Sequence, residues 1–224
     1  MFTNNAGGLS FTRSDGATQP QALLPAKGVQ AANSFSPDGK RLSYTEVAGF
    51  RQLFTVALEE QGGQLKAGQP ELFLKSETAN NYASIFSPDG HWLAYLSNES
   101  GRDEIYVRPF PPPASGLGGK WQISNGGAAR AAMWSHNGHV LYYQQRDQLM
   151  AVSYTTNGDT FVAEKPRVWI PKLGATGAAV VAPDDKRVAA ITPVEAASAP
   201  QQEHEIVMLV NFFDEVRRRV PQAK

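Results

Sequence analysis

The fold of this chain is decided by residues 82–124, which read YASIFSPDGHWLAYLSNESGRDEIYVRPFPPPASGLGGKWQIS. Short segments rich in apolar and aromatic residues alternate here with turn residues, a pattern typical of antiparallel strands. The tetrapeptide Ser-Pro-Asp-Gly at positions 87–90 recurs at 36–39, and degenerate copies stand at 135–138 and 182–185. Asp-Gly between two strands is a strong hairpin signal, because both central residues of the tightest turn need positive φ. The repeated tetrapeptide therefore predicts a repeated hairpin turn.

The spacing of these turns predicts the architecture. The third residue of each copy lies at 38, 89, 137 or 184, so that successive copies are 51, 48 and 47 residues apart. A period of about 45 to 50 residues that contains several short strands indicates a β-propeller with one blade per repeat. We therefore expect an all-β, single-domain β-propeller of four to five blades, each blade a four-stranded antiparallel sheet, with a short C-terminal helix.

The repeat also predicts where the blades begin and end. We expect the outer strands of a closing blade in 1–28, blades in 29–78, 79–126 and 127–173, the rest of the closing blade in 174–212, and a terminal helix and tail in 213–224. The two chain ends would then share one blade and remove open sheet edges. The alternative is a homo-oligomer that pairs through unsatisfied edges. The helix is predicted because apolar residues fall at 212, 213, 216 and 220, near helical spacing.

Composition excludes some classes of protein. The 224 residues suffice for one sizeable core, and the 21 basic and 21 acidic residues balance, so no bulk charge draws the protein to nucleic acid or to an anionic membrane. The absence of cysteine excludes disulfides, thiolate metal sites and a cysteine nucleophile. No apolar run reaches the roughly 20 residues of a membrane span, and the first residues do not read as a signal peptide. The compartment stays open, since the chain could also be a piece of a longer protein.

The repeats resemble the TolB-like, WD-repeat-like propeller family, whose blades share a core of the type Ser-Pro-Asp-Gly-Lys/Arg-x-apolar-Ala/Ser-Tyr/Phe. That core stands here as SPDGKRLSY at 36–44 and SPDGHWLAY at 87–95. More narrowly, SNESGRDEIYVRPFP at 97–111, KWQIS at 120–124 and IVMLVNFFDEVRRRVP at 206–221 resemble the C-terminal propeller of bacterial serine/threonine protein kinases. The resemblance covers most of the chain.

The resemblance implies a sensor or interaction domain. In such kinases a kinase domain and a membrane segment precede the propeller, which would then be extracytoplasmic. This chain carries no Gly-rich loop before a valine, no His-Arg-Asp and no Asp-Phe-Gly, so it cannot phosphorylate a substrate. Propellers of the family more often have six or more blades, and the blade count is where this sequence departs from the pattern.

Histidines offer one alternative interpretation. His136 and His139 flank the third turn, and His91 follows the second turn beside Asp89. Such a set could hold a divalent metal such as zinc, with an open position for water. Against this, equivalent turns of neighbouring blades lie far apart unless they are near the axis, and solvated histidines are common in hairpin turns. We therefore expect no cofactor, with a zinc or calcium site as the alternative.

Other chemistry-bearing residues have simpler structural explanations. Glu99 and Asp103 share one loop and could bind calcium, but a solvated hairpin loop accounts for them equally. No Gly-x-Ser-x-Gly nucleophile motif is present. We expect the strand aromatics to form the core between blades rather than a ligand cage. These aromatics are Phe86, Trp92, Tyr95, Trp121, Trp134, Tyr142 and Trp169.

The first hypothesis for function is a non-catalytic β-propeller that binds a protein or small-molecule ligand where loops converge on the axis. The inner strands predict Asn33, Tyr82 and Arg130 at this axial mouth, with Arg130 suited to an anionic group. The second hypothesis is a metal-dependent hydrolase of ester, lactone or phosphoester bonds, with the histidine set and Asp89 as ligands. A third is a purely structural, oligomerising piece. Fold alone does not decide among them.

Overall fold

The computed structural model describes residues 1–3, 7–13, 15, 19–25, 28–62, 64–114, 116, 118–127, 129–136, 139–174 and 179–191, and the statements below refer to these residues. The chain divides into two compact units, Met1–Pro193 and Val194–Lys224, and the second lies outside the described residues. The described part is all-β and contains no helix, which agrees with the predicted fold class. Among the described residues there is thus no helix long and apolar enough to cross a membrane.

Two complete sheets surround the two full Ser-Pro-Asp-Gly turns, as the repeat predicts. Each is antiparallel and four-stranded, and its strands follow in chain order. The first contains β4 (Val29–Phe35), β5 (Arg41–Ala48), β6 (Phe50–Gln61) and β7 (Gln64–Leu74). The second contains β8 (Asn81–Phe86), β9 (Trp92–Ser97), β10 (Glu104–Pro109) and β11 (Trp121–Gln122).

The third sheet has one strand more than the repeat predicts. It contains β12 (Ala129–Trp134), β13 (Val140–Gln145), β14 (Gln148–Asn157), β15 (Thr160–Ala163) and β16 (Arg167–Ile170). The long β14 pairs with β16 through its first half and with β15 through its second half. The extra strand arises because β14 continues past the blade into a hairpin turn at Gly158, whose φ is +55°.

Smaller sheets stand at either end of the described chain. Near the N-terminus, β2 (Leu9–Phe11) pairs with β1 (Phe2–Thr3) and β3 (Gln21–Ala22). The last sheet holds β17 (Ala179–Val181) and β18 (Val188–Ala190). The expected strand at 206–210 and the terminal helix lie outside the described residues. Closure of a blade by both chain ends, the blade boundaries and the number of blades therefore stay predictions.

The repeated turn forms as expected, with one correction. Gly39 N–H donates to Ser36 O (2.9 Å) and Gly90 N–H to Ser87 O (2.9 Å), so that both copies close the same turn. The glycines have φ of +70° and +74°, whereas neither aspartate is in the left-handed region. The expectation of positive φ at both central residues is therefore wrong. Instead, the aspartate side chain accepts hydrogen bonds within the turn, as Asp38 Oδ1 does from Ser36 Oγ (2.6 Å).

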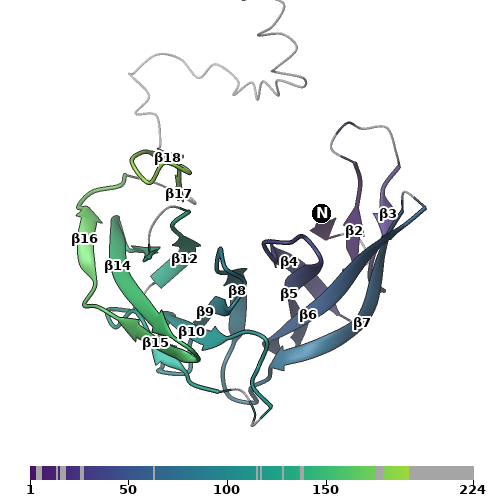
Figure 1. The fold of residues 1–224 in the computed structure, drawn as a ribbon, viewed down its shortest axis with the longest axis horizontal. Helices are drawn as coiled ribbons and strands as arrows, with labels where there is room; N and C mark the ends of the chain where they lie inside the picture. Colours follow the sequence, from purple (N-terminus) through teal and green to yellow (C-terminus); the bar gives the residue numbers. More distant parts are fainter. Residues whose placement is uncertain are drawn as a thin grey trace, which may run out of the picture. The chain divides into compact units, whose positions relative to one another are not determined.

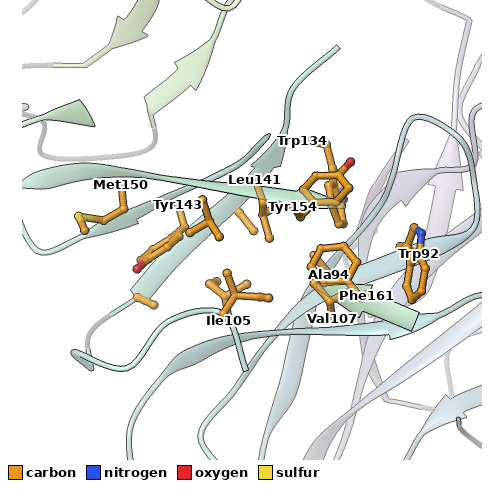
Figure 2. Packing of buried hydrophobic residues seen from close by; sticks show 14 of the residues in the cluster. Trp92, Ala94, Ile105, Val107, Trp134, Leu141, Tyr143, Met150, Tyr154 and Phe161 are labelled. Carbon is orange, nitrogen blue, oxygen red and sulfur yellow. The ribbon is translucent and has the colours of Figure 1, made fainter. Parts of the chain in front are cut away.

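Consecutive sheets pack against each other in chain order (Figure 1): β8 against β4 to β6, β12 against β8 to β10, and β17 against β12. Four apolar clusters fill the spaces between them, one for each pair of neighbouring sheets. Figure 2 shows the largest, where Trp92, Trp134, Tyr154 and Phe161 meet between the second and third sheets. The prediction that the strand aromatics form the core is confirmed, since all seven belong to or pack against these clusters.

Candidate ligand-binding site on the inner strands

The first strand of each repeat is an edge strand, and these inner strands carry the candidate site. β4, β8 and β12 each pair with only one strand of their own sheet. Each also contains a one-residue bulge: between Ala32 and Ser34 in β4, between Tyr82 and Ile85 in β8, and between Arg130 and Ala132 in β12. Bulges change the direction in which a strand presents its side chains and are common at the rims of binding sites.

Backbone strain marks two of these bulges. Ala83 has φ of +52° and Ala131 has φ of +38°, a region that non-glycine residues rarely adopt. Each such residue costs on the order of 1 kcal/mol or more. Ala83 and Ala131 hold equivalent places, four residues before the serine of their turns. The residues that directly precede them are Tyr82 and Arg130, two of the three residues that the sequence predicts at the axial mouth.

Arg130 lies within electrostatic range of the Tyr82 phenol, and Arg51 lies over the Tyr82 ring. The Arg51 guanidinium is 4.9 Å from the centroid of this ring. The Asp103 carboxylate lies near enough to the Tyr82 phenol to help raise its pKa. We call Arg51, Tyr82, Asp103 and Arg130 the arginine cluster. It joins three sheets, because Arg51 is the second residue of β6, Tyr82 is in β8 and Arg130 is in β12. Asp103 O accepts the backbone N–H of Ala129 (3.1 Å).

The arginine cluster is suited to an anion. Burial first, and then the hydrogen bond and charge of Asp103, raise the pKa of Tyr82 to about 12, so its hydroxyl stays protonated near neutral pH. Both arginines are exposed, and neither forms an ion pair with any residue that the structure describes. Two guanidinium groups beside one carboxylate leave a net positive charge. Guanidinium groups bind carboxylate or phosphate through paired hydrogen bonds.

Asn33 has a different environment. Its Nδ2 donates to Thr45 Oγ1 (2.9 Å) and to Ser84 Oγ (3.0 Å), which links the first and second sheets. The buried Ser43 adds a bond from its hydroxyl to Ser84 O (3.3 Å). The amide of Asn33 is thus engaged in packing between sheets, and the structure does not bring it into the arginine cluster.

At the opposite ends of the same inner strands lies an apolar groove of about 530 Å³. Its floor includes Ile85 and Met133, which follow Tyr82 and Arg130 by three residues along β8 and β12. Phe35 and Val180 are 48% and 59% exposed at the groove. At about 3.3 Å per residue, the groove begins roughly 10 Å from the arginine cluster. The inner strands therefore carry charged side chains near one end and an apolar groove near the other.

The structure places the predicted metal ligands at separate sites. His91 and Asp89 line a hollow of about 560 Å³ beside the first turn, whereas His136 lines the apolar groove. His139 packs against the Tyr154 ring, 5.3 Å between centroids. Among the described residues no group of three or more His, Asp or Glu side chains could hold a metal ion. The zinc or calcium site stays a prediction without geometric support.

The recurring carboxylates serve the turns. Asp89 Oδ1 accepts from Ser87 Oγ and from the backbone N–H of His91 (3.0 Å), and Asp184 Oδ1 accepts from Lys186 N–H (3.0 Å). In the first turn, hydrogen bonds from the Ser36 side chain and the Lys40 backbone stabilise the Asp38 carboxylate and so lower its pKa. Glu99 forms an ion pair with Lys120 (2.7 Å), whereas Asp103 acts on the Tyr82 phenol. The loop pair suggested for calcium is thus divided between two other partners.

The sequence analysis did not single out Arg51, and it considered Asp103 only as a calcium ligand together with Glu99. Arg51 lies directly after the Gly49 turn, whose φ is +82°, and pairs with Val47 across the hairpin. Hairpin register could have placed Arg51 near the start of its strand, but not over the Tyr82 ring of another sheet. Contacts between sheets depend on how blades pack, which one-dimensional patterns do not encode.

Comparison with known proteins supports the fold. No family model matches the sequence. The solved structure of TolB from Acinetobacter baumannii superposes with a TM-score of 0.54 at 15% identity, over 80% of this chain and 41% of that protein. This chain thus spans about two fifths of that TolB.

Two further solved structures superpose with lower scores. A putative TolB from Agrobacterium tumefaciens gives a TM-score of 0.44 at 15% identity, over 68% of this chain and 55% of that protein. A putative 6-phosphogluconolactonase from Bacteroides uniformis gives 0.45 at 17% identity, over 69% and 46%. Together with the repeated antiparallel sheets, the match to the first TolB identifies the fold of this chain as a TolB-like β-propeller.

Proposed function

We propose that this protein is a non-catalytic binding module that takes an extended ligand along its inner strands. The observation that carries the proposal is the arginine cluster, in which Arg51 lies over the Tyr82 ring and Arg130 lies within electrostatic range of the protonated hydroxyl. An anionic group of the ligand would bind there. The apolar part of the ligand would lie about 10 Å away, in the groove whose lining includes Phe35, Ile85 and Met133.

The spacing favours a short peptide segment of a partner protein. An extended peptide rises about 3.3 Å per residue, so three or four residues would span the distance from a carboxylate to the groove. Backbone groups on the free edges of β8 and β12 could also pair with such a segment, as in recognition by strand addition. A small ligand that carries both an acidic and an apolar group would satisfy the same geometry.

A peptide pair tests this proposal. Acetyl-Leu-Leu-Phe-Glu with a free C-terminus and its Gln, C-terminally amidated counterpart differ only in negative charge. We expect the acidic peptide to bind at least tenfold more tightly, and replacement of Arg51 and Arg130 by glutamine to abolish that difference. Arg167→Gln, on the exposed outer strand β16, is the matched control. Equal affinity of both peptides for the wild-type protein would overturn the proposal.

The sensor role follows from the resemblance to kinase-linked propellers and belongs to the same proposal. A bound ligand would then be the signal that a membrane-anchored partner domain transmits. The alternative function, a metal-dependent hydrolase, is tested by the metal content of the purified protein and by a screen of ester and lactone substrates. Stoichiometric metal, with activity that a chelator removes and metal restores, would replace the binding proposal.

A further inference from the structure

A separate cavity of about 430 Å³ lies between the N-terminal sheet and the first full sheet. It shares no lining residue with the apolar groove or the arginine cluster. Residues after β3 form one side, and β4, β5, β6 and β7 form the other. The lining residues are Leu23, Leu24, Pro25, Gln30, Tyr44, Glu46, Phe54, Ala67, Gly68, Gln69 and Pro70.

Gln30 lines this cavity and has one buried acceptor atom that is unused. Its side-chain Nε2 donates to Glu46 Oε2 (2.7 Å) and, more weakly, to Pro25 O (3.5 Å). Its backbone is also engaged, because N–H donates to Gly7 O (2.7 Å) and O accepts from Thr3 Oγ1 (2.6 Å). The two acceptors around Nε2 fix the amide orientation, so Oε1 faces elsewhere. Gln30 is only 2% exposed and Oε1 has no hydrogen-bond partner.

Glu46 adds a negative charge beside this acceptor. Its carboxylate accepts the bond from Gln30 but forms no ion pair with any of the described residues. The charge also lies close to the Tyr44 phenol, since burial and, secondarily, Glu46 raise the pKa of Tyr44. A half-buried carboxylate and a buried carbonyl oxygen on one wall need hydrogen-bond donors, preferably cationic ones.

The remaining walls are suited to a hydrocarbon chain. Tyr44 and Phe54 stack with their ring centroids 5.4 Å apart and their planes inclined by 17°. Leu23, Leu24 and Ala67 lie around them. Aromatic faces also attract cations, which adds to the effect of the carboxylate.

We propose that this cavity binds a primary ammonium group on an aliphatic chain. The ammonium donates to the Glu46 carboxylate and to Gln30 Oε1, and the chain lies along the wall of Tyr44, Phe54 and Leu24. The ligand is a free alkylamine or the lysine side chain of a partner protein. This site is independent of the proposed peptide binding, and its failure would leave that proposal intact.

Protein-observed NMR with two probes tests the site. Pentylammonium represents the free amine, and Nα-acetyl-lysine amide represents a lysine side chain. We expect saturable shifts of Gln30 and Glu46 resonances with at least one probe and none with pentan-1-ol, which lacks the charge. The tighter-binding probe identifies the source of the amine. Absence of saturable shifts with both probes would overturn the proposal.

Matched variants locate the charge. Glu46→Gln keeps an acceptor for Gln30 Nε2 but removes the negative charge, and we expect the favoured probe to bind about ten- to a hundredfold more weakly. Glu60→Gln, an exposed change on the β6–β7 hairpin, is expected to leave affinity unchanged. A thermal melt without ligand verifies that each variant is folded. Equal affinity of the Glu46→Gln variant and the wild-type protein would contradict the proposed site.

Lys27 provides the last control, because it is close in sequence to the cavity-lining Pro25. Lys27→Ala is expected to bind the probe as the wild-type protein does. Binding that appears only in this variant would overturn the proposal of an external ligand and make Lys27 of this chain the occupant.

Discussion

The two central interfaces between sheets are built differently. In the first, between β4–β7 and β8–β11, the inner part is a network of hydroxyl and amide groups that joins Asn33, Thr45 and Ser84. The second, between β8–β11 and β12–β16, holds the largest apolar cluster, which includes Trp134 and Phe161 (Figure 2). Polar bonds cross there as well, from Trp134 Nε1 to Ile85 O (3.2 Å) and from Ala129 N–H to Asp103 O (3.1 Å).

The two interfaces therefore contribute differently to the alignment of the strands and to the stability of the fold. A hydrogen bond contributes a net 0.5–1.5 kcal/mol or so, since water competes for the same groups in the unfolded chain. Its geometry nevertheless fixes how the inner strands β4 and β8 align. Burial of a large apolar side chain contributes roughly 1.5–3 kcal/mol, and the hydrophobic effect that drives it is not directional. We infer that the first interface sets the alignment of the inner strands and that the second stabilises the propeller.

Phe161→Ala should have the largest effect. Phe161 is 1% exposed and contacts the rings of Trp92, Trp134 and Tyr154. The cavity left behind should lower the free energy of unfolding by about 3–5 kcal/mol, as measured by urea denaturation. Phe161→Leu, which fills most of the space, should cost clearly less. An effect of Phe161→Ala below about 1 kcal/mol would contradict the role of the second interface.

Alkaline pH should weaken the second interface next. Burial raises the pKa of Tyr143 and of Tyr154 to about 12, above the usual value of 10.0. Below pH 10 these tyrosines are protonated in both the folded and the unfolded chain, so their contribution to the free energy of unfolding is fully present. Between pH 10 and 12 the unfolded chain loses its protons first, so stability falls as pH rises. Thermal melts across this range should show a shallower decline for Tyr154→Phe, and an unchanged slope would contradict this assignment.

Ser84→Ala should have a smaller effect at the first interface. The change removes the hydroxyl that accepts from Asn33 Nδ2, while Thr45 remains as a partner for the amide. We expect the free energy of unfolding to fall by about 1 kcal/mol. A loss as large as that of Phe161→Ala would show that the network supplies stability as well as alignment.

The coupling free energy between Asn33 and Ser84 should be the smallest of these effects. A double-mutant cycle with Asn33→Ala and Ser84→Ala isolates the bond of 3.0 Å between them. We expect a coupling free energy of about 0.5 kcal/mol, measured by urea denaturation of all four proteins. A value indistinguishable from zero would mean that the two residues act independently and that this bond does not align β4 with β8.

Much of the fold could be predicted from the sequence because it is local. The turn at 36–39 needs one glycine at positive φ and one proline at a strand end, and both occur in every good copy of the repeat. The strands around Trp92 and Leu141 follow from short apolar segments. The extra strand β15 was not predicted, because Thr160–Ala163 is only four residues long and lies outside the four-strand repeat.

The candidate site was only partly predictable, because some of its features are local to one repeat and others depend on contacts between sheets. Tyr82 and Arg130 hold equivalent places in their repeats, so the repeat alone suggested both. The predicted role of Asn33 did not anticipate that Ser84 and Thr45 would take up its amide. The contribution of Arg51 depends on the packing of one sheet on the next, which the sequence pattern does not encode.

The most direct test of the arginine cluster is an NMR titration that observes the arginine Nε–H signals during addition of acetyl-Leu-Leu-Phe-Glu. We expect the signals of Arg51 and Arg130 to shift together and saturate, while that of Arg167 stays in place. Raising the salt concentration should weaken the response, because exposed charges are screened. Unchanged Arg51 and Arg130 signals while the peptide binds elsewhere would contradict the proposed binding site.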